Sequence, residues 1–357
     1  MHKRLTHSLT ASLSAALLLV GSLGQTAAWA SSEPNPEPTP GFPLAGKYGY
    51  PDDKSDISDS TPTPYTVINY GGIPTKGPNF VNIGDSHTVT AWIPTTIPEP
   101  CLHNALGFAQ VVGQKTGLDV RDASCAGAGI EHYWHTKNTY LGGIPKAAQR
   151  LAVNKNTKLV VASLGGNDTY DDPMAVVIAK CSEFWAKKKP CADYLAPQMM
   201  VRTRALSPAM YYMLMDIKAR AAKDAVVIGM GYYAPMPRNY KGCWADGLLP
   251  DGDLKLIHDY VVELNHQMQM AAKKAGVIFY NPSQYITFKT SGCGTPQERL
   301  ITLTGLPEAN MPIHPTLRGQ WLSADTVVKL YNQELTARKA GTSIAPATWT
   351  VSYDTKG

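Results

Sequence analysis

Short apolar runs alternate with longer amphipathic segments from residue 79 onward. Five runs have the length and the aliphatic or aromatic content of strands, namely residues 80–84, 118–123, 158–164, 225–229 and 277–280. Four longer segments have the apolar spacing of helices, namely residues 104–116, 205–222, 254–274 and 320–340. Strands that alternate with helices in this way predict an α/β fold, with a parallel sheet covered by helices on both faces.

The first 30 residues have the pattern of an export signal. Lys3 and Arg4 precede an apolar run at residues 13–23, and the small residues Ala28 and Ala30 flank Trp29. This order is typical of a secretory signal peptide that is cleaved after Ala30. The apolar run is short for a bilayer span, and an uncleaved membrane anchor is the alternative.

The rest of the chain divides into three parts. Residues 31–78 are rich in proline and polar residues and predict a leader or linker, residues 79–340 form the predicted domain, and residues 341–357 form a tail. Loss of the signal peptide lowers the formal net charge from +5 to +3, because it removes two basic residues and no acidic ones. This near balance disfavours a nucleic-acid partner. We expect a monomer that is secreted or associated with the cell envelope and has no transmembrane anchor after signal cleavage.

All six cysteines lie after the predicted signal peptide, at Cys101, Cys125, Cys181, Cys191, Cys243 and Cys293. An even number in an exported chain predicts three disulfides, although the sequence alone does not fix which cysteines pair. Metal binding is the weaker alternative, because the chain has no Cys-x-x-Cys pair.

Polar residues that can carry chemistry follow the predicted strands. The sequence Gly-Asp-Ser ends at Ser86 after the first strand, Gly127 follows the second, and Gly-Gly-Asn-Asp at 165–168 follows the third. His314 precedes the last predicted helix. Parallel sheets bind ligands at the carboxyl ends of their strands, so these residues are expected at one edge of the sheet.

These residue types match the needs of serine-type ester hydrolysis. Ser86 has the hydroxyl of a nucleophile, and His314 can act as the base. The main-chain N–H groups of Ser86 and Gly127 and the side-chain amide of Asn167 can hold an oxyanion. Each signal is weak by itself, because Gly, Asn, Asp and Ser are common in turns. Their occurrence in this order carries the hypothesis.

Two groups of residues could be taken for metal ligands, but neither has the spacing of a known metal site. His132 and His135 are three residues apart but have no third ligand in a matching motif. Asp168, Asp171 and Asp172 lack the spacing of an EF-hand loop and are expected to form a solvated turn.

The ordered blocks resemble those of the SGNH hydrolases, which are also called the GDSL family. The Gly-Asp-Ser block at Ser86 is similar to their first block, Gly127 to the second, Gly165-x-Asn167 to the third and His314 to the fifth. Residues 79–340 are most similar to secreted actinobacterial lipases and esterases with three disulfides. The resemblance implies a flavodoxin-like, three-layer α/β/α sandwich. This fold lacks the G-x-S-x-G elbow of the α/β-hydrolases, and the sequence indeed has no G-x-S-x-G motif.

The resemblance also implies a function and a cysteine pairing. The implied disulfides are Cys101–Cys125, Cys181–Cys191 and Cys243–Cys293. The implied activity is hydrolysis of a carboxylic ester through an acyl-enzyme on Ser86, without a metal or organic cofactor. A lipid, a short ester or an acylated glycan would be the substrate. The alternatives are an acyltransferase of the cell envelope and a non-catalytic protein that binds wall or lipid.

The chain departs from the family pattern at two positions. His87 follows the serine, where relatives usually carry an aromatic or aliphatic residue, and Met311 stands where they carry an acid three residues before the histidine. A main-chain carbonyl can orient an imidazole without a carboxylate. We therefore predict a Ser86–His314 dyad in which the Met311 carbonyl orients the histidine. A triad completed by Glu308 is the alternative.

Overall fold

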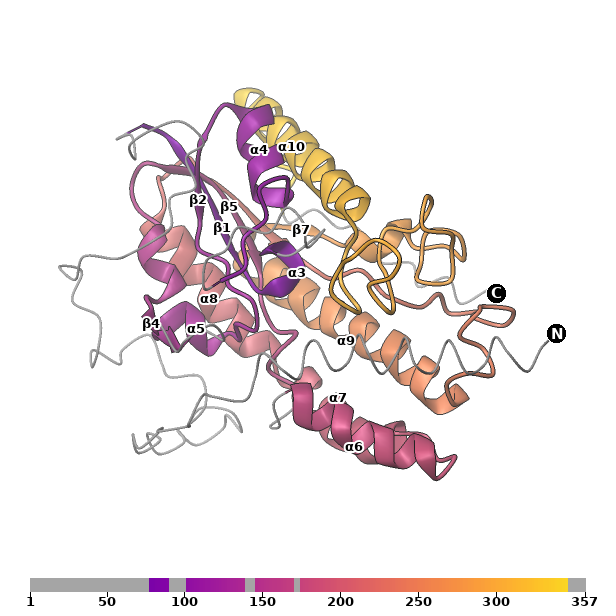
Figure 1. The fold of residues 1–357 in the computed structure, drawn as a ribbon. Coiled ribbons are helices and arrows are strands. Elements are labelled where there is room, and N and C mark those ends of the chain that lie inside the picture. Colours follow the sequence, from indigo (N-terminus) through magenta and orange to yellow (C-terminus); the bar gives the residue numbers. More distant parts are fainter. Residues whose placement is uncertain (1–76, 90–100, 139–144, 170–173, 346–357) are drawn as a thin grey trace, which may run out of the picture.

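The computed structural model describes residues 77–89, 101–138, 145–169 and 174–345 (Figure 1). Its centre is a five-stranded parallel sheet with the strand order β2-β1-β5-β6-β7. The strands are β1 (Asn79–Gly84), β2 (Asp119–Asp122), β5 (Thr157–Ser163), β6 (Val226–Met230) and β7 (Ile278–Tyr280). All five lie where the sequence predicts strands, so the predicted parallel α/β sheet is confirmed.

Side chains of β1 and β5 alternate between two hydrophobic cores. Phe80 and Leu159 face one core, whereas Val81 and Val160 face the other. This follows from the two-residue repeat of a strand. Both faces of the sheet are therefore buried, which explains why these strands are nearly continuous apolar runs in the sequence.

Helices cover the two faces of the sheet in separate layers (Figure 1). Helices α4 (Phe108–Thr116) and α10 (Leu317–Lys339) pack together on the face that holds Phe80. Helices α8 (Ser207–Arg220) and α9 (Asp251–Ala275) pack on the opposite face. The result is the three-layer α/β/α sandwich that the resemblance implies.

The four predicted helices are present with shifted ends. The largest shift is at α4, which begins at Phe108 and not at residue 104. The side chain of Asn104 accepts a hydrogen bond from the Leu106 N–H (2.9 Å), and its carbonyl accepts one from the Gly107 N–H (3.2 Å). Asn104 therefore closes a turn before the helix instead of joining it.

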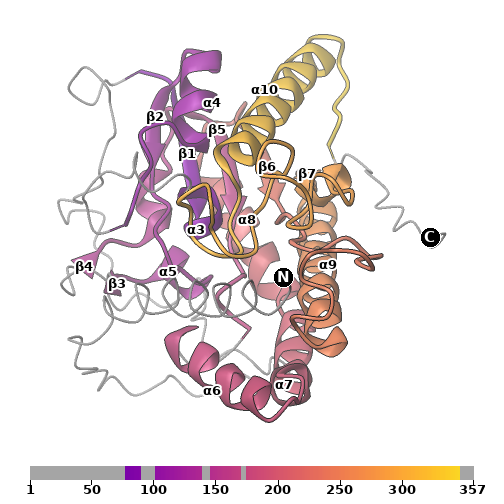
Figure 2. The same ribbon diagram turned by 45° about the vertical axis from the view of Figure 1, so that its right-hand side comes forward.

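A helical hairpin and several short elements complete the described structure. The hairpin consists of α6 (Met174–Ala186) and α7 (Ala192–Arg204), and it projects away from α4 and α10 (Figures 1 and 2). The short elements are α3 (Ser86–Val89), α5 (Glu131–Trp134), β3 (Lys137–Asn138), β4 (Pro145–Lys146), and the 3-10 helices η2 (Gln149–Ala152) and η3 (Pro282–Tyr285).

Three disulfides join Cys101 to Cys125, Cys181 to Cys191 and Cys243 to Cys293. These are the pairs that the resemblance implies. Within the described ranges, no helix combines the length and the apolar character needed to cross a membrane. The predicted signal peptide and nearly all of the predicted leader lie outside the described residues.

Candidate active site

The predicted site residues follow strands that end at the same edge of the sheet. β1 ends at Gly84, directly before Asp85 and helix α3, and β5 ends at Ser163, before the loop at 165–168. The Cys125 N–H donates to the Gly84 carbonyl (3.1 Å), which fixes the segment that contains Gly127 beside the end of β1. In both ribbon views, the loop that precedes α10 runs beside α3 (Figures 1 and 2).

Ser86 is the first residue of α3 and is partly buried. The turn that presents it is held by Asp85, whose carboxylate accepts the His87 N–H (2.9 Å) and whose carbonyl accepts the Val89 N–H (3.2 Å). Gly84 is required before this turn, since a Cβ atom there would lie 2.2 Å from Thr88 Oγ1. The local sequence therefore fixes the main chain on both sides of Ser86.

Gly127 occupies a tight turn after β2. The Ala128 N–H donates to the Cys125 carbonyl (3.0 Å), and Gly127 has a φ of 71° at the third position of this turn. Glycine adopts such a backbone conformation without steric cost. The N–H groups of Ala126 and Ala128 are bonded within this segment, to the carbonyls of Cys101 (3.2 Å) and Cys125 (3.0 Å), so the oxyanion role of the Gly127 N–H stays a prediction.

Asn167 connects the three blocks that follow β1, β2 and β5. Its side-chain amide donates to the Ala128 carbonyl (3.0 Å) and makes a longer contact with Asp85 Oδ2 (3.4 Å). Ala128 adjoins Gly127, and Asp85 adjoins Ser86. The structure thus brings together the sequence neighbourhoods of all three predicted oxyanion donors.

His314 is oriented by a different carbonyl from the one predicted. Its Nδ1 lies 2.6 Å from the carbonyl oxygen of Pro312, so the proposal of the Met311 carbonyl is wrong in this structure. Ile313 has a φ of 60°, which turns the chain back and brings the carbonyl two residues upstream to the ring. Because a carbonyl only accepts, Nδ1 carries the proton and Nε2 holds the lone pair.

Glu308, the alternative orienting acid, is bonded elsewhere. Its carboxylate forms a two-point ion pair with the guanidinium of Arg299, whose side chain is buried. Arg299 also donates to the Leu306 carbonyl. This pair stabilises the loop that carries His314 without supplying a carboxylate to the imidazole.

His87 belongs to α3, and its ring packs against the residues that follow β6. Its Nε2 accepts the main-chain N–H of Tyr233 (3.2 Å), so the neutral ring carries its proton on Nδ1. The ring centroid is 4.9 Å from that of Tyr232 and 6.3 Å from that of His314. Burial, and secondarily the nearby His314, hold the pKa of His87 well below its usual value. The His87 ring therefore lies beside His314 in its uncharged form.

Two further side chains, Asp85 and Tyr232, are buried at this site and have no predicted role in the sequence pattern. The Tyr232 hydroxyl donates to Asp85 Oδ2 (2.7 Å) and accepts the Gly166 N–H (3.1 Å). Burial raises the pKa of Asp85 to about 7, against the lowering effect of the hydrogen bonds from Tyr232 and the His87 N–H. Asp85 was visible only as part of the Gly-Asp-Ser block, and Tyr232 has no local sequence signal.

Neither the histidine pair at 132 and 135 nor the aspartates at 168–172 form a metal site in the described residues. His132 Nδ1 accepts the Gly129 N–H (2.9 Å), which uses one of its two possible ligand atoms. The expected solvated turn is wrong for Asp168, which is 1% exposed and whose carboxylate accepts the Ile130 N–H (3.0 Å) after Gly127. Asp171 and Asp172 lie outside the described residues. In the part of the chain that the structure describes, no three potential ligand side chains are grouped.

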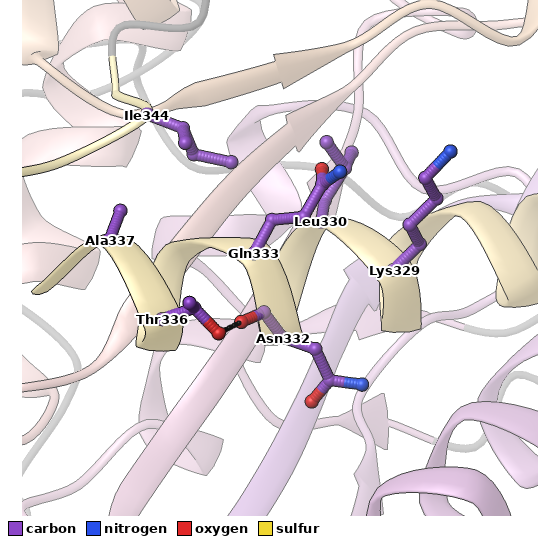
Figure 3. A pocket seen from close by; sticks show the side chains of 7 residues that line it. All are labelled: Lys329, Leu330, Asn332, Gln333, Thr336, Ala337 and Ile344. Atoms are coloured by element: carbon purple, nitrogen blue, oxygen red, sulfur yellow. Dashed lines mark hydrogen bonds between the residues drawn. The ribbon is translucent and has the colours of Figure 1, made fainter. Parts of the chain in front are cut away.

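A hollow of about 700 Å³ lies on α10, away from these residues (Figure 3). It is lined by Lys329, Leu330, Asn332, Gln333, Thr336, Ala337 and Ile344. None of the predicted site residues lines it. Helix α10 instead contacts the nucleophile turn near its other end, where the Gln320 amide donates to the His87 carbonyl (3.4 Å).

Comparison with known families agrees with this arrangement. Residues 83–322 match the model of the GDSL-like lipase/acylhydrolase family, a range that includes Ser86, Gly127, Asn167 and His314. The chain belongs to this family. As a GDSL-like hydrolase, it has its candidate residues at the carboxyl ends of the strands and before the last helix. No curated protein has a matching sequence.

Two solved structures share the fold of this family member. An extracellular lipase from Streptomyces rimosus is 19% identical, with a TM-score of 0.53, and the match covers 71% of this chain and all of that one. A phospholipase A1 from Streptomyces albidoflavus is 18% identical, with a TM-score of 0.50, and the match covers 70% of this chain and 98% of that one. At this level of identity, the likeness concerns the fold.

Proposed function

We propose that this GDSL-like hydrolase is a secreted carboxylic-ester hydrolase that acts through a Ser86–His314 dyad. The main support is the position of Asn167, whose amide lies between the Ala128 carbonyl and the Asp85 carboxylate. These two contacts connect the Asn167 loop to the segment that carries Gly127 and to the turn that carries Ser86. The six cysteines, all paired in three disulfides, support an oxidising and hence extracellular location.

The proposed reaction begins with proton transfer from Ser86 to His314 Nε2. Ser86 Oγ then bonds to the acyl carbon, and the carbonyl electrons form an oxyanion. The N–H groups of Ser86 and Gly127 donate to that oxyanion, and the amide of Asn167 joins them by exchanging its 3.4 Å contact with Asp85 for the substrate oxygen. When the tetrahedral intermediate collapses, His314 protonates the departing alcohol and leaves an acyl group on Ser86.

Water completes the cycle by the same chemistry. His314 Nε2 takes a proton from water, the resulting hydroxide attacks the acyl carbon, and Ser86 recovers its proton as the acid leaves. The hydrogen bond from His314 Nδ1 to the Pro312 carbonyl keeps the ring in the required tautomer throughout. This role needs the Pro312 main chain and no particular side chain at residue 312.

An apolar acyl group would find exposed apolar side chains on the two segments that carry His314 and Gln320. Ile313, directly before His314, is 44% exposed, and Trp321, next to Gln320, is 45% exposed. The structural neighbours described as a lipase and a phospholipase act on substrates of this kind, which supports the same substrate class here.

Hydrolysis of nitrophenyl esters over a range of acyl lengths tests this proposal. We expect turnover that Ser86→Ala abolishes and that favours medium or long chains. Asn167→Ala should lower kcat by about 10²–10³ with a much smaller change in KM, because the oxyanion donor acts mainly in the transition state. Product analysis with an added alcohol separates hydrolysis from acyl transfer. An unchanged kcat in Asn167→Ala would contradict the oxyanion role.

A further inference from the structure

Two buried polar side chains beneath the candidate site have no part in the proposed proton transfers. Asp85 is 1% exposed and Tyr232 is 6% exposed. Burial of a carboxyl group and a phenol is costly unless their hydrogen bonds are made. Both groups are bonded here, and their partners belong to the segments that carry Ser86 and Asn167.

Asp85 uses its two carboxylate oxygens on different segments. Oδ1 accepts the His87 N–H (2.9 Å), which lies in the turn of the nucleophile. Oδ2 accepts the Tyr232 hydroxyl (2.7 Å) and contacts the Asn167 amide (3.4 Å). One side chain therefore spans the space between the Ser86 turn and the loop at 165–168.

Tyr232 connects the same loop to the end of β6. Its hydroxyl accepts the Gly166 N–H (3.1 Å) while it donates to Asp85. Its main chain is held by Asn265 of α9, which accepts the Tyr232 N–H (2.7 Å) and donates to its carbonyl (2.9 Å). Tyr232 is therefore held at its main chain by helix α9 and at its hydroxyl by Asp85 and Gly166.

Gly166 packs tightly against Asp85 and Tyr232. A Cβ atom at residue 166 would lie 3.2 Å from both Asp85 Oδ2 and the Tyr232 ring. The Gly166 carbonyl also accepts the hydroxyl of Tyr260 (2.7 Å). Gly166, directly before Asn167, is thus held by two tyrosines, Tyr232 after β6 and Tyr260 of α9.

We infer that Asp85 and Tyr232 are positioning residues that act as one unit and fix the Asn167 loop relative to the Ser86 turn. This role rests on the proposed function, because it serves the distance between a nucleophile and its oxyanion donor. Neither side chain touches the reacting atoms in the proposed mechanism. Their effect passes through Gly166, Asn167 and the His87 N–H.

The kinetic test uses Tyr232→Phe, which removes the hydroxyl and keeps the ring. Misplacement of the loop should lower kcat by about 10–100-fold, with KM within about threefold of the wild-type value. Tyr233→Phe is the matched control: this neighbouring phenol is equally buried, but its hydroxyl bonds to the Gly319 carbonyl (2.8 Å) and to Ser323 (3.0 Å). The control should lose thermal stability to a similar degree and keep its kcat.

Asp85→Asn tests whether the two side chains form a unit. If they do, Asp85→Asn/Tyr232→Phe should lose no more activity than the worse single variant. Independent, multiplicative losses would contradict the inference. A Tyr232→Phe variant with the kcat of Tyr233→Phe would overturn it.

Hydrogen exchange separates this inference from the proposed function. In folded Tyr232→Phe, the amides of residues 164–169 should exchange faster than in the wild type and in Tyr233→Phe. Unchanged exchange overturns the positioning role, whatever the activity. If the wild type hydrolyses no ester and yet exchange rises in Tyr232→Phe, the proposed function fails while the connection between the two segments stands.

Discussion

The imidazole of His314 donates through Nδ1 to the main-chain carbonyl of Pro312, at a distance of 2.6 Å. Burial lowers the pKa of His314 below its usual value of 6.5, and this hydrogen bond raises it by less. The ring therefore stays neutral, and able to accept a proton, at a lower pH than a free histidine would. No side-chain carboxylate takes part in this contact.

The pH dependence of kcat/KM should reflect this lowered pKa. We expect the acidic limb of the profile to have its midpoint below pH 6.5, since activity is lost only when His314 becomes protonated. His314→Ala should abolish turnover at every pH. A midpoint well above 6.5 would indicate a carboxylate beside the ring and would contradict orientation by a carbonyl.

Glu308→Gln should affect stability much more than catalysis. The change leaves the buried guanidinium of Arg299 without its counter-charge, which should cost about 3 kcal/mol of unfolding free energy. We expect kcat of the folded protein to stay within about tenfold of wild type. Denaturant unfolding and kinetics below the transition temperature measure the two effects. A loss of several orders of magnitude with the fold intact would reveal a hidden triad.

The disulfides should differ in their effect on activity. Cys101–Cys125 adjoins the turn of Gly127, so Cys101→Ala/Cys125→Ala should lower both kcat and stability, the latter by about 2–5 kcal/mol. Cys181–Cys191 lies in the hairpin of α6 and α7 and is the matched control. Its removal should lower the melting temperature and spare kcat. Equal kinetic effects of the two double variants would contradict this assignment.

Asp85 should make the folded state less stable as the pH rises. Its pKa is about 7 in the folded protein and 3.8 in its ordinary state, so between these values the folded state binds the additional proton. The free energy of unfolding should therefore fall from pH 4 to pH 7, by on the order of 3 kcal/mol from this group. His87 and His314 have lowered pKa values and act in the opposite direction below pH 6.5.

Comparison of wild type with Asp85→Asn isolates the contribution of Asp85. The difference in unfolding free energy between the two proteins should change across pH 4–7 in favour of the variant at the higher pH. Urea unfolding at several pH values measures this difference. A difference that does not vary with pH would show that Asp85 titrates normally.

Much of the sheet could be predicted from the sequence, because strands buried on both faces leave continuous apolar runs. The run at residues 158–164 is an example, and β5 lies within one residue of these predicted bounds. Helix α7 gives no such signal, since Pro197 stands inside it and proline usually ends a helix. Its place is set by packing against α9, where Ala192 N–H donates to Asp253.

The parts of the site that escaped prediction depend on backbone geometry and distant contacts. The predicted orienting carbonyl was one residue too early, because Ile313 adopts a positive φ that a β-branched residue rarely has. Tyr232 reaches Asp85 across 147 positions of the chain, so no local pattern marks it. The order of Ser86, Gly127, Asn167 and His314 was visible because each follows or precedes a recognisable element.

The most direct test of the central proposal is covalent labelling by a fluorophosphonate, followed by peptide mapping. We predict one phosphonylated residue, Ser86, with labelling lost in Ser86→Ala and strongly slowed in His314→Ala, because the base that activates the hydroxyl is gone. Folded wild-type protein that takes up no label, or that takes it up on another residue, would contradict the proposed nucleophile.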